Sequence, residues 1–138
     1  MQLHTEHFRR GYLAVCEGVP VPSEGTIDAP LGPKDGSLVE QTVRSDGKRA
    51  RTHYRVLEEK NGRALLRLDL DTGRTHQIRV HMAHIGHPLT GDFLYGTEDR
   101  ALIPRTALHS AYLSFRHPIT GERLEFELEL PKDMGRLL

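Results

Sequence analysis

The chain has 138 residues, which is enough for one compact domain and too few for two. Hydrophobic residues make up 37% of it and charged residues 28%, and its apolar runs stay far below the roughly 20 residues that a membrane helix needs, which excludes a membrane span. Basic and acidic residues balance at 19 each, although 15 of the basic residues are arginine. The single Cys16 cannot form an internal disulfide, and the first residues do not resemble a secretory signal, so we expect a cytoplasmic protein.

The N-terminal part of the chain predicts a strand followed by a long connection. Tyr12, Ala14 and Cys16 recur at every second position, as in a strand with one apolar face. Glycine and proline crowd residues 18–37, which predicts an irregular connection with one short strand around residues 26–28. Taken by itself, Tyr12 is expected to be a buried strand residue whose hydroxyl is hydrogen bonded.

The next segment, residues 43–56, carries a local charge of +4. Its acidic residue is Asp46, and its basic residues are Arg44, Lys48, Arg49, Arg51 and Arg55. Arginine suits bidentate contact with phosphate and stacking on bases, so the segment predicts a basic face for nucleic acid. A solvated charged hairpin explains the same charges equally well.

Two β-hairpins are predicted further along. Residues 50–58 and 63–70 flank Asn61-Gly62, a strong signal for a type I′ turn because both central residues of that turn need positive φ. Residues 108–116 and 122–130 flank a four-residue turn. The second arm of each hairpin alternates apolar and polar residues, which gives it one apolar face.

Between the hairpins, residues 75–85 predict one helix. Thr75 is the expected N-cap, and Ile78, Met82 and Ile85 form an apolar stripe along one side. A glycine after the stripe, followed by a proline, predicts the end of the helix. The element order predicts an α+β fold, with a mixed, mostly antiparallel sheet and one central helix in a single domain spanning 1–138.

The start of this helix is a candidate anion site. Free backbone N–H groups and the positive end of the helix dipole favour a phosphate or a carboxylate there, and Arg74 and Arg79 add positive charge. Because Arg79 lies off the apolar stripe, we expect it to face something other than the core. Two ordinary surface arginines remain an equal alternative.

Two other residue types invite functional interpretations that we do not adopt. Nine histidines suggest a metal site, and His81 and His84 stand three residues apart on the predicted helix, but the further ligands of a zinc site are not obvious. We therefore expect no metal, and we expect His81 and His109 to pack in the core or to bond to the backbone. Asp92, in a Gly-Asp turn, is interpreted as a turn-capping carboxylate rather than a catalyst.

One long motif begins at the turn before the predicted helix, runs through the helix and continues to residue 96. It comprises Gly73-Arg74-Thr75-His76-Gln77-Ile78-Arg79-Val80-His81, followed by Ile85-Gly86-His87-Pro88, Gly91-Asp92 and Tyr95-Gly96. This pattern resembles the signature of RNA pseudouridine synthases of the ribosomal large-subunit and tRNA type. Other stretches are similar to the remaining motifs of that family and occur in the same order: Arg10-Gly11-Tyr12-Leu13-Ala14-Val15, Asp46-Gly47-Lys48, and Leu108-His109-Ser110-Ala111.

The resemblance implies an enzyme that isomerises uridine in RNA to pseudouridine without a cofactor. In such enzymes the bond from C1′ to N1 breaks, the uracil turns, and a new bond joins C1′ to C5. An aspartate starts the reaction, a tyrosine lies against the flipped uracil, and an arginine pairs with the aspartate. By position in the motifs, Tyr12 takes the tyrosine role and Arg79 takes the arginine role.

The expected partner is RNA, either ribosomal or transfer RNA. Contacts are predicted from the basic segment and from the start of the helix. The residues predicted to bind RNA are Arg44, Lys48, Arg49, Arg51, Arg74, His76 and Gln77.

The catalytic aspartate of the family normally lies upstream of the tyrosine strand, and no aspartate precedes Tyr12 here. Asp69 and Asp71 lie in a sequence similar to the one around the family's catalytic aspartate, but this sequence is inside the central motif, so we do not assign either residue as catalytic. The chain therefore resembles the C-terminal half of the family's catalytic domain, and we expect it to be inactive alone and to be completed by an N-terminal half or to form a homodimer. The alternative is a non-catalytic RNA-binding module that reuses the fold.

Overall fold

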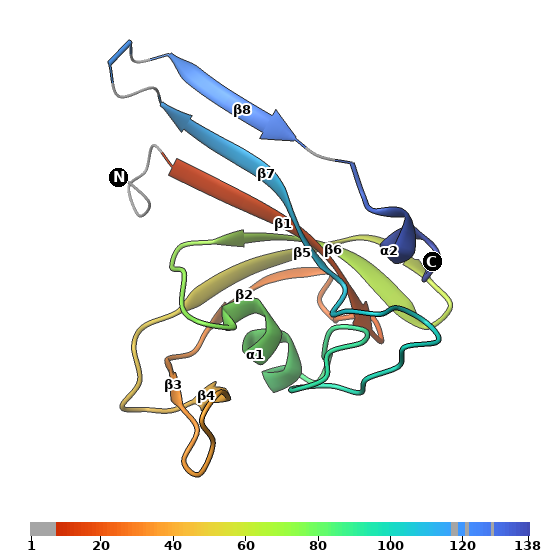
Figure 1. The fold of residues 1–138 in the computed structure, drawn as a ribbon. Coiled ribbons are helices and arrows are strands. Elements are labelled where there is room, and N and C mark those ends of the chain that lie inside the picture. The colour runs from red at the N-terminus through yellow and green to blue at the C-terminus, as the bar shows by residue number, and fades with distance from the viewer. Residues whose placement is uncertain (1–7, 117–118, 121, 128) are drawn as a thin grey trace.

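A six-stranded antiparallel sheet forms the centre of the molecule (Figure 1). The computed structural model describes residues 8–116, 119–120, 122–127 and 129–138. The strand order is β2-β5-β6-β1-β7-β8, and each neighbouring pair is antiparallel. The strands are β1 (Phe8–Glu17), β2 (Glu24–Asp28), β5 (Arg51–Lys60), β6 (Arg63–Leu70), β7 (Leu108–Arg116) and β8 (Arg123–Glu127).

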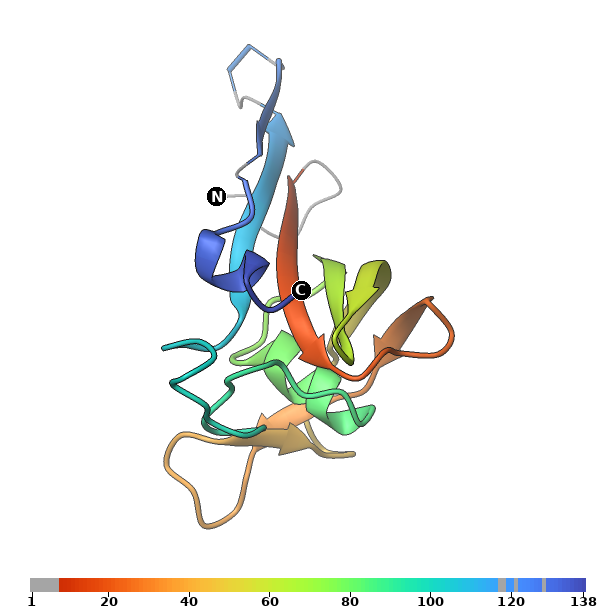
Figure 2. The same cartoon turned by 90° about the vertical axis from the view of Figure 1, so that its right-hand side faces the viewer.

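Three smaller elements complete the fold. A separate two-stranded hairpin, β3 (Leu31–Pro33) and β4 (Gln41–Val43), lies beside the helix α1 (Gln77–His84). The short helix α2 (Lys132–Gly135) follows β8. Figure 2 shows α1 on one face of the sheet and α2 on the other.

Two apolar cores hold these layers together. On the α1 face, Leu66 and Leu68 of β6 pack against Ile78 and Met82 of the helix, and all four are buried. Full burial of a leucine side chain contributes about 1.5–3 kcal/mol, so β6 and α1 fix each other's position. On the opposite face, a second cluster joins the sheet to α2 through Val15, Ile103, Ala107, Met134 and Leu137.

The predicted α+β class and mostly antiparallel sheet are confirmed. Asn61 and Gly62 have φ values of 56° and 73°, as the predicted turn between β5 and β6 requires. The short strand expected around residues 26–28 is β2, and the stripe of Ile78 and Met82 faces the core as expected. Within the described residues, no helix is long and apolar enough to cross a membrane.

The start of α1 differs from the prediction. Thr75 is not the N-cap: the helix begins at Gln77, and the preceding residue is His76, with φ 56° in the left-handed region. The side chain of Gln77 orders the turn before the helix: its Oε1 accepts hydrogen bonds from the backbone N–H of Arg74 at 3.0 Å and from the hydroxyl of Thr72 at 2.7 Å. The N-cap His76 makes no side-chain capping hydrogen bond.

The sequence did not predict two elements of the structure, and one predicted turn lies partly outside the described residues. The β3–β4 hairpin lies where an irregular connection was predicted, and the four-residue α2 was not predicted at all. The four-residue turn predicted between β7 and β8 includes residues 118 and 121, which lie outside the described residues, as do residue 117 before it and residue 128 of the predicted second arm.

Candidate active site

Tyr12 opens onto a hollow at the start of α1. In the pairing of β1 with β7, Gly11 faces Tyr112 and Tyr12 faces Ser110, so a bulge shifts the register at Tyr12. Bulges of this kind re-aim a side chain. Tyr12 is half-buried, and its hydroxyl makes no hydrogen bond to any described residue, contrary to the expectation of a satisfied core tyrosine.

The hollow has a volume of about 340 Å³, within the range of about 300–1,000 Å³ of small-ligand sites. Its wall combines one side of α1, the turn before the helix, the middle of β1, the end of β6 and the start of β7. The lining residues are Tyr12, Leu70, Gly73, Arg74, His76, Gln77, Ile78, Arg79 and Leu108. Tyr12 and Arg79, which the sequence assigned to the same reaction, thus share one concave surface.

Arg79 is held by a carboxylate of this chain. Its Nε donates to Asp92 Oδ2 at 3.0 Å and its Nη2 donates to Asp92 Oδ1 at 2.8 Å. The side chain of Arg79 is 13% exposed and that of Asp92 is fully buried. Arg79 therefore already forms a bidentate pair with a carboxylate of this chain, whereas its pairing with an aspartate from outside the chain stays a prediction.

Asp92 also caps its turn, as predicted. Its Oδ1 accepts hydrogen bonds from the backbone N–H groups of Leu94 and Tyr95 at 3.0 and 3.1 Å. Burial alone would raise the pKa of Asp92, but the hydrogen bonds from Arg79 and from these two amides outweigh it and hold the pKa below the usual value. The carboxylate therefore stays ionised at neutral pH.

The turn that carries Asp92 depends on Gly91. This residue has φ +77°, and an added Cβ would lie 2.7 Å from the carbonyl oxygen of Arg105 and 2.7 Å from Cγ2 of Ile103. A side chain at this position would meet both a strained backbone and a steric clash. The Gly-Asp pair of the motif is thus explained by the turn that delivers the carboxylate to Arg79.

The same turn holds His76. Tyr95 Oη lies 2.7 Å from His76 Nδ1 and accepts a hydrogen bond from the backbone N–H of Gln41, in β4, at 2.9 Å. Burial and the neighbouring Arg79 guanidinium lower the pKa of His76, so the ring is neutral at pH 7. Since Gln41 donates to the tyrosine oxygen, we infer that the Tyr95 hydroxyl donates to Nδ1 and that the imidazole proton sits on Nε2.

Gln77 and His81 belong to the interior. Gln77 is 3% exposed and His81 is fully buried. Gln77 Nε2 donates to Arg51 O and to Thr52 Oγ1, while its Oε1 accepts from the Thr72 hydroxyl and from Arg74 N. All four of its hydrogen-bonding positions are used, which does not fit the predicted contact of Gln77 with RNA.

His81 continues this buried network. Its Nε2 donates to Ala29 O at 2.9 Å, and its Nδ1 accepts from the hydroxyl of Thr52 at 2.8 Å. Burial lowers the pKa of His81, so the ring is neutral. The backbone bonding expected for this residue is confirmed, and the network ties α1 to β5 and to the segment that leads into β3.

A second hollow, of about 600 Å³, lies between the β3–β4 hairpin and the turn before α1. It shares Gly73 and Arg74 with the Tyr12 hollow, so the two adjoin. Lys48 lines it and is held there by a backbone bridge to Leu31. The bridge requires Gly47, because a Cβ at that position would lie 2.5 Å from the carbonyl oxygen of Leu31. Lys48 is exposed and forms no ion pair with a described residue.

The other residues predicted to bind RNA differ in whether their side chains are already paired within the protein. Arg49 is exposed and pairs with no described carboxylate, and its carbonyl accepts a hydrogen bond from Arg74 Nε at 2.8 Å. Arg44 is already occupied by Asp46, Asp35 and the carbonyl of Pro33.

Arg51 lies 3.5 Å from the carboxylates of both Asp28 and Asp71. The predicted basic face is therefore smaller than the charge count suggests, because Arg44 and Arg51 are neutralised by neighbours.

Asp69 and Asp71, whose neighbouring sequence is similar to that of the family's catalytic aspartate, lie away from the hollow. Asp71 accepts a hydrogen bond from His53 Nε2 at 2.8 Å, and Asp69 lies 3.7 Å from Arg67 Nε. Neither lines the hollow with Tyr12. In the part of the chain that the structure describes, no three histidine, cysteine or acidic side chains come together as metal ligands.

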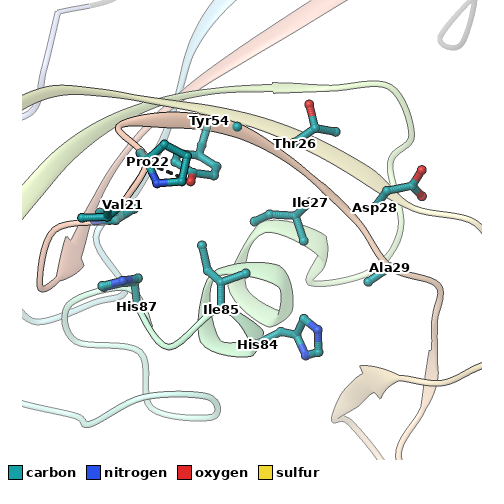
Figure 3. A pocket seen from close by; sticks show the side chains of 12 residues that line it. Val21, Pro22, Thr26, Ile27, Asp28, Ala29, Tyr54, His84, Ile85 and His87 are labelled. Carbon is teal, nitrogen blue, oxygen red and sulfur yellow. Dashed lines mark hydrogen bonds between the residues drawn. The ribbon is translucent and has the colours of Figure 1, made fainter.

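A further hollow lies at the other end of α1, against β2 (Figure 3). It has a volume of about 550 Å³ and is lined by Ile27, Tyr54, Ile85 and both His84 and His87, among others. The Tyr54 hydroxyl donates to Pro22 O at 2.9 Å. No residue of the predicted site lines this hollow, so the predicted groups gather at the N-terminal end of the helix.

Comparisons with known proteins show the family of the chain and its fold. The sequence model of the family described as RNA pseudouridylate synthase matches residues 1–84, more than half of the chain. The chain belongs to this family. It is 49% identical over 130 residues to an uncharacterized RNA pseudouridine synthase, YjbO, of Bacillus subtilis, with 94% of this chain and 46% of that protein covered. It is 45% identical over 145 residues to the ribosomal large subunit pseudouridine synthase D of Nitrosomonas europaea, with 99% and 42% covered.

Solved structures show the same fold. The human RNA pseudouridylate synthase domain containing 1 protein superposes with a TM-score of 0.76 at 29% identity, covering 89% of this chain and 55% of that one. The chain spans slightly less than half the length of the curated relatives it matches.

Proposed function

We propose that this chain supplies Tyr12 and Arg79 to the active site of an RNA pseudouridine synthase that acts on ribosomal or transfer RNA in the cytoplasm. The observation that carries the proposal is the hollow shared by these two residues, in a chain that belongs to the family. A uridine flipped out of its stack enters the hollow and lies against Tyr12. The reaction is an isomerisation: the C1′–N1 bond breaks, C1′ bonds to C5, and the proton of C5 leaves as N1 gains one.

The nucleophilic aspartate comes from outside these 138 residues. Within the hollow, Arg79 Nη1 donates no hydrogen bond to a described residue and can donate to that carboxylate. A carboxylate next to a guanidinium stays ionised and therefore nucleophilic at neutral pH. The half of the catalytic domain that carries this aspartate, or a second copy of the chain that contributes one, completes the site.

RNA reaches the hollow along the basic surface beside it. Lys48 and Arg49 have no competing carboxylate among the described residues, and Arg74 lies where the two hollows meet. We propose that these three side chains contact phosphates, while His76 donates from Nε2 to the RNA inside the hollow. Phosphate contacts place the strand, and the hollow selects the base.

The proposal is tested with RNA that carries tritium at C5 of uridine, because pseudouridine formation releases that hydrogen to water. The chain is assayed alone and mixed with the N-terminal half of the Bacillus subtilis relative. Release is expected from the mixture and is expected to be lost with Tyr12→Phe, whereas Tyr54→Phe, in the separate hollow of Figure 3, should retain it.

Binding of RNA with no tritium release from any combination would contradict the proposed enzyme and favour the non-catalytic RNA-binding module. Release that is unchanged in Tyr12→Phe would remove Tyr12 from the site.

A further inference from the structure

Asp92 does more than its turn requires. The turn needs one acceptor, and Oδ1 supplies it by accepting from the amides of Leu94 and Tyr95. An asparagine would cap such a turn equally well. Among the described residues, the second oxygen, Oδ2, accepts a hydrogen bond only from Arg79 Nε, at 3.0 Å. A carboxylate at this position, rather than an amide, is therefore explained by the guanidinium.

The geometry fixes which part of Arg79 remains available. Nε and Nη2 lie on the same edge of the guanidinium plane, and both donate to Asp92. The rings of Phe93 and Tyr95 lie 5.1 and 5.2 Å from the guanidinium carbon, which restricts tilting of the plane. Because a bidentate pair sets both distance and orientation, Nη1 is left in one defined position.

We propose that Asp92 is a positioning residue of the active site: it holds the Arg79 guanidinium in one orientation, so that its remaining N–H groups, both on Nη1 and one on Nη2, face the reacting groups. This inference rests on the proposed function of the hollow, which it deepens. Asp92 also neutralises Arg79, which reduces the cost of placing a cation that is 13% exposed at the wall of a pocket. Arg79 therefore meets the reacting carboxylate as a directed donor rather than as an unpaired charge.

The arrangement extends to His76 through the same turn. Tyr95 comes three residues after Asp92 and holds His76 Nδ1, while His76 and Arg79 are separated by about one helical turn. One short turn thus orients two of the polar side chains that line the hollow, His76 and Arg79. A change at Asp92 is expected to act on Arg79 directly and on His76 only through the turn.

Nuclear magnetic resonance of the chain itself provides the first test. The Nε–Hε signal of Arg79 is expected to exchange slowly with water in the wild type and at least ten times faster in Asp92→Asn, which keeps the turn cap and removes the carboxylate. Asp133→Asn is the matched control, because Arg105 binds Asp133 through the same two nitrogens at 3.0 Å each. That variant should release Arg105 and leave Arg79 unchanged. An Arg79 signal unaffected by Asp92→Asn would overturn the inference whether or not the protein isomerises uridine.

A double-mutant cycle in the completed enzyme provides the second test, and it does not require the single Asp92 variant to fold. If Asp92 acts through Arg79, Arg79→Gln and the double variant Arg79→Gln/Asp92→Asn should have kcat values within about twofold of each other. A further loss of tenfold or more in the double variant, at unchanged KM, would overturn the inference. If the completed enzyme releases no tritium even in the wild type, the proposed function fails and the signal of Arg79 alone decides the role of Asp92.

Discussion

Two faces of α1 use similar residues in opposite ways. Gln77 and His81 point into the protein, where each of their polar atoms has a protein partner. His76, just before the helix, and Arg79 line the hollow, as part of Gln77 does, but unlike Gln77 each keeps one nitrogen for which the described residues provide no partner. A side chain whose hydrogen-bonding atoms all have protein partners supports the fold. A side chain that is fixed by some of its polar atoms and keeps another one free is available to bind a ligand.

The largest effect is expected on the buried face. His81→Ala removes two buried hydrogen bonds and leaves a cavity, so the free energy of unfolding should fall by about 2–4 kcal/mol. His84→Ala, in the last turn of the same helix but exposed, should change it by less than about 0.5 kcal/mol. Urea unfolding followed by circular dichroism measures both. Equal losses from the two variants would mean that the network around His81 adds no stability.

Arg79→Lys tests the side of α1 that lines the Tyr12 hollow, and the expected change in free energy is somewhat smaller. Lysine keeps the positive charge beside Asp92 but loses the planar fork, so kcat of the completed enzyme should fall by about 100-fold, a loss of about 2.7 kcal/mol. RNA affinity should change by less than about threefold. Arg105→Lys, in a matched ion pair outside the Tyr12 hollow, is the control. A parallel loss of affinity and turnover would show that Arg79 binds RNA rather than serving the chemical step.

The basic surface should contribute through salt-dependent binding. The double variant Lys48→Ala/Arg49→Ala should weaken binding to every RNA by a similar factor, about tenfold, because phosphate contacts carry no sequence information. The slope of log K against log salt should decrease by about 1.4–1.8 for the two contacts. Filter binding at several salt concentrations measures it. The matched variant Arg44→Ala, whose guanidinium is occupied by Asp46 and Asp35, should leave the slope unchanged.

The smallest expected effect is a dependence of stability on pH. Burial lowers the pKa of His81 in the folded protein, so the unfolded chain binds more protons once the pH falls below about 6.5, the ordinary value. Stability is therefore full above that pH and should fall by about 1 kcal/mol between pH 7 and pH 5.5. His76, whose pKa is also lowered, adds to the same trend. His81→Gln should reduce this slope, which thermal unfolding at the two pH values measures; an unchanged slope would contradict the prediction.

Local signals in the sequence predicted much of the fold. Asn61-Gly62 predicted the turn between β5 and β6 because positive φ at both residues is a local property. The apolar stripe of α1 predicted its buried side for the same reason. The β3–β4 hairpin was missed because its strands have only three residues each, because β3 contains glycine and proline, and because the two strands pair through contacts that no local period reveals.

The site was predicted less completely than the fold. The family resemblance predicted that Tyr12 and Arg79 share one site. It did not show that Gln77 is a buried structural residue while His76 keeps a free nitrogen, because the partners that bury Gln77 come from β5 and from the preceding turn. The pairing of Arg79 with Asp92 spans 13 residues and depends on the backbone of the Gly-Asp turn. The Gly-Asp and Tyr-Gly pairs of the signature were the signal that could have pointed to Asp92 and Tyr95.

The most direct test of the two-face account is to titrate the isolated chain with a uridine-rich single-stranded RNA and to follow its side-chain signals by nuclear magnetic resonance. The imidazole signals of His76 and the ring signals of Tyr12 should shift with RNA, while those of His81 stay in place. Shifts of His81 as large as those of His76, or binding that leaves both Tyr12 and His76 unmoved, would contradict the account.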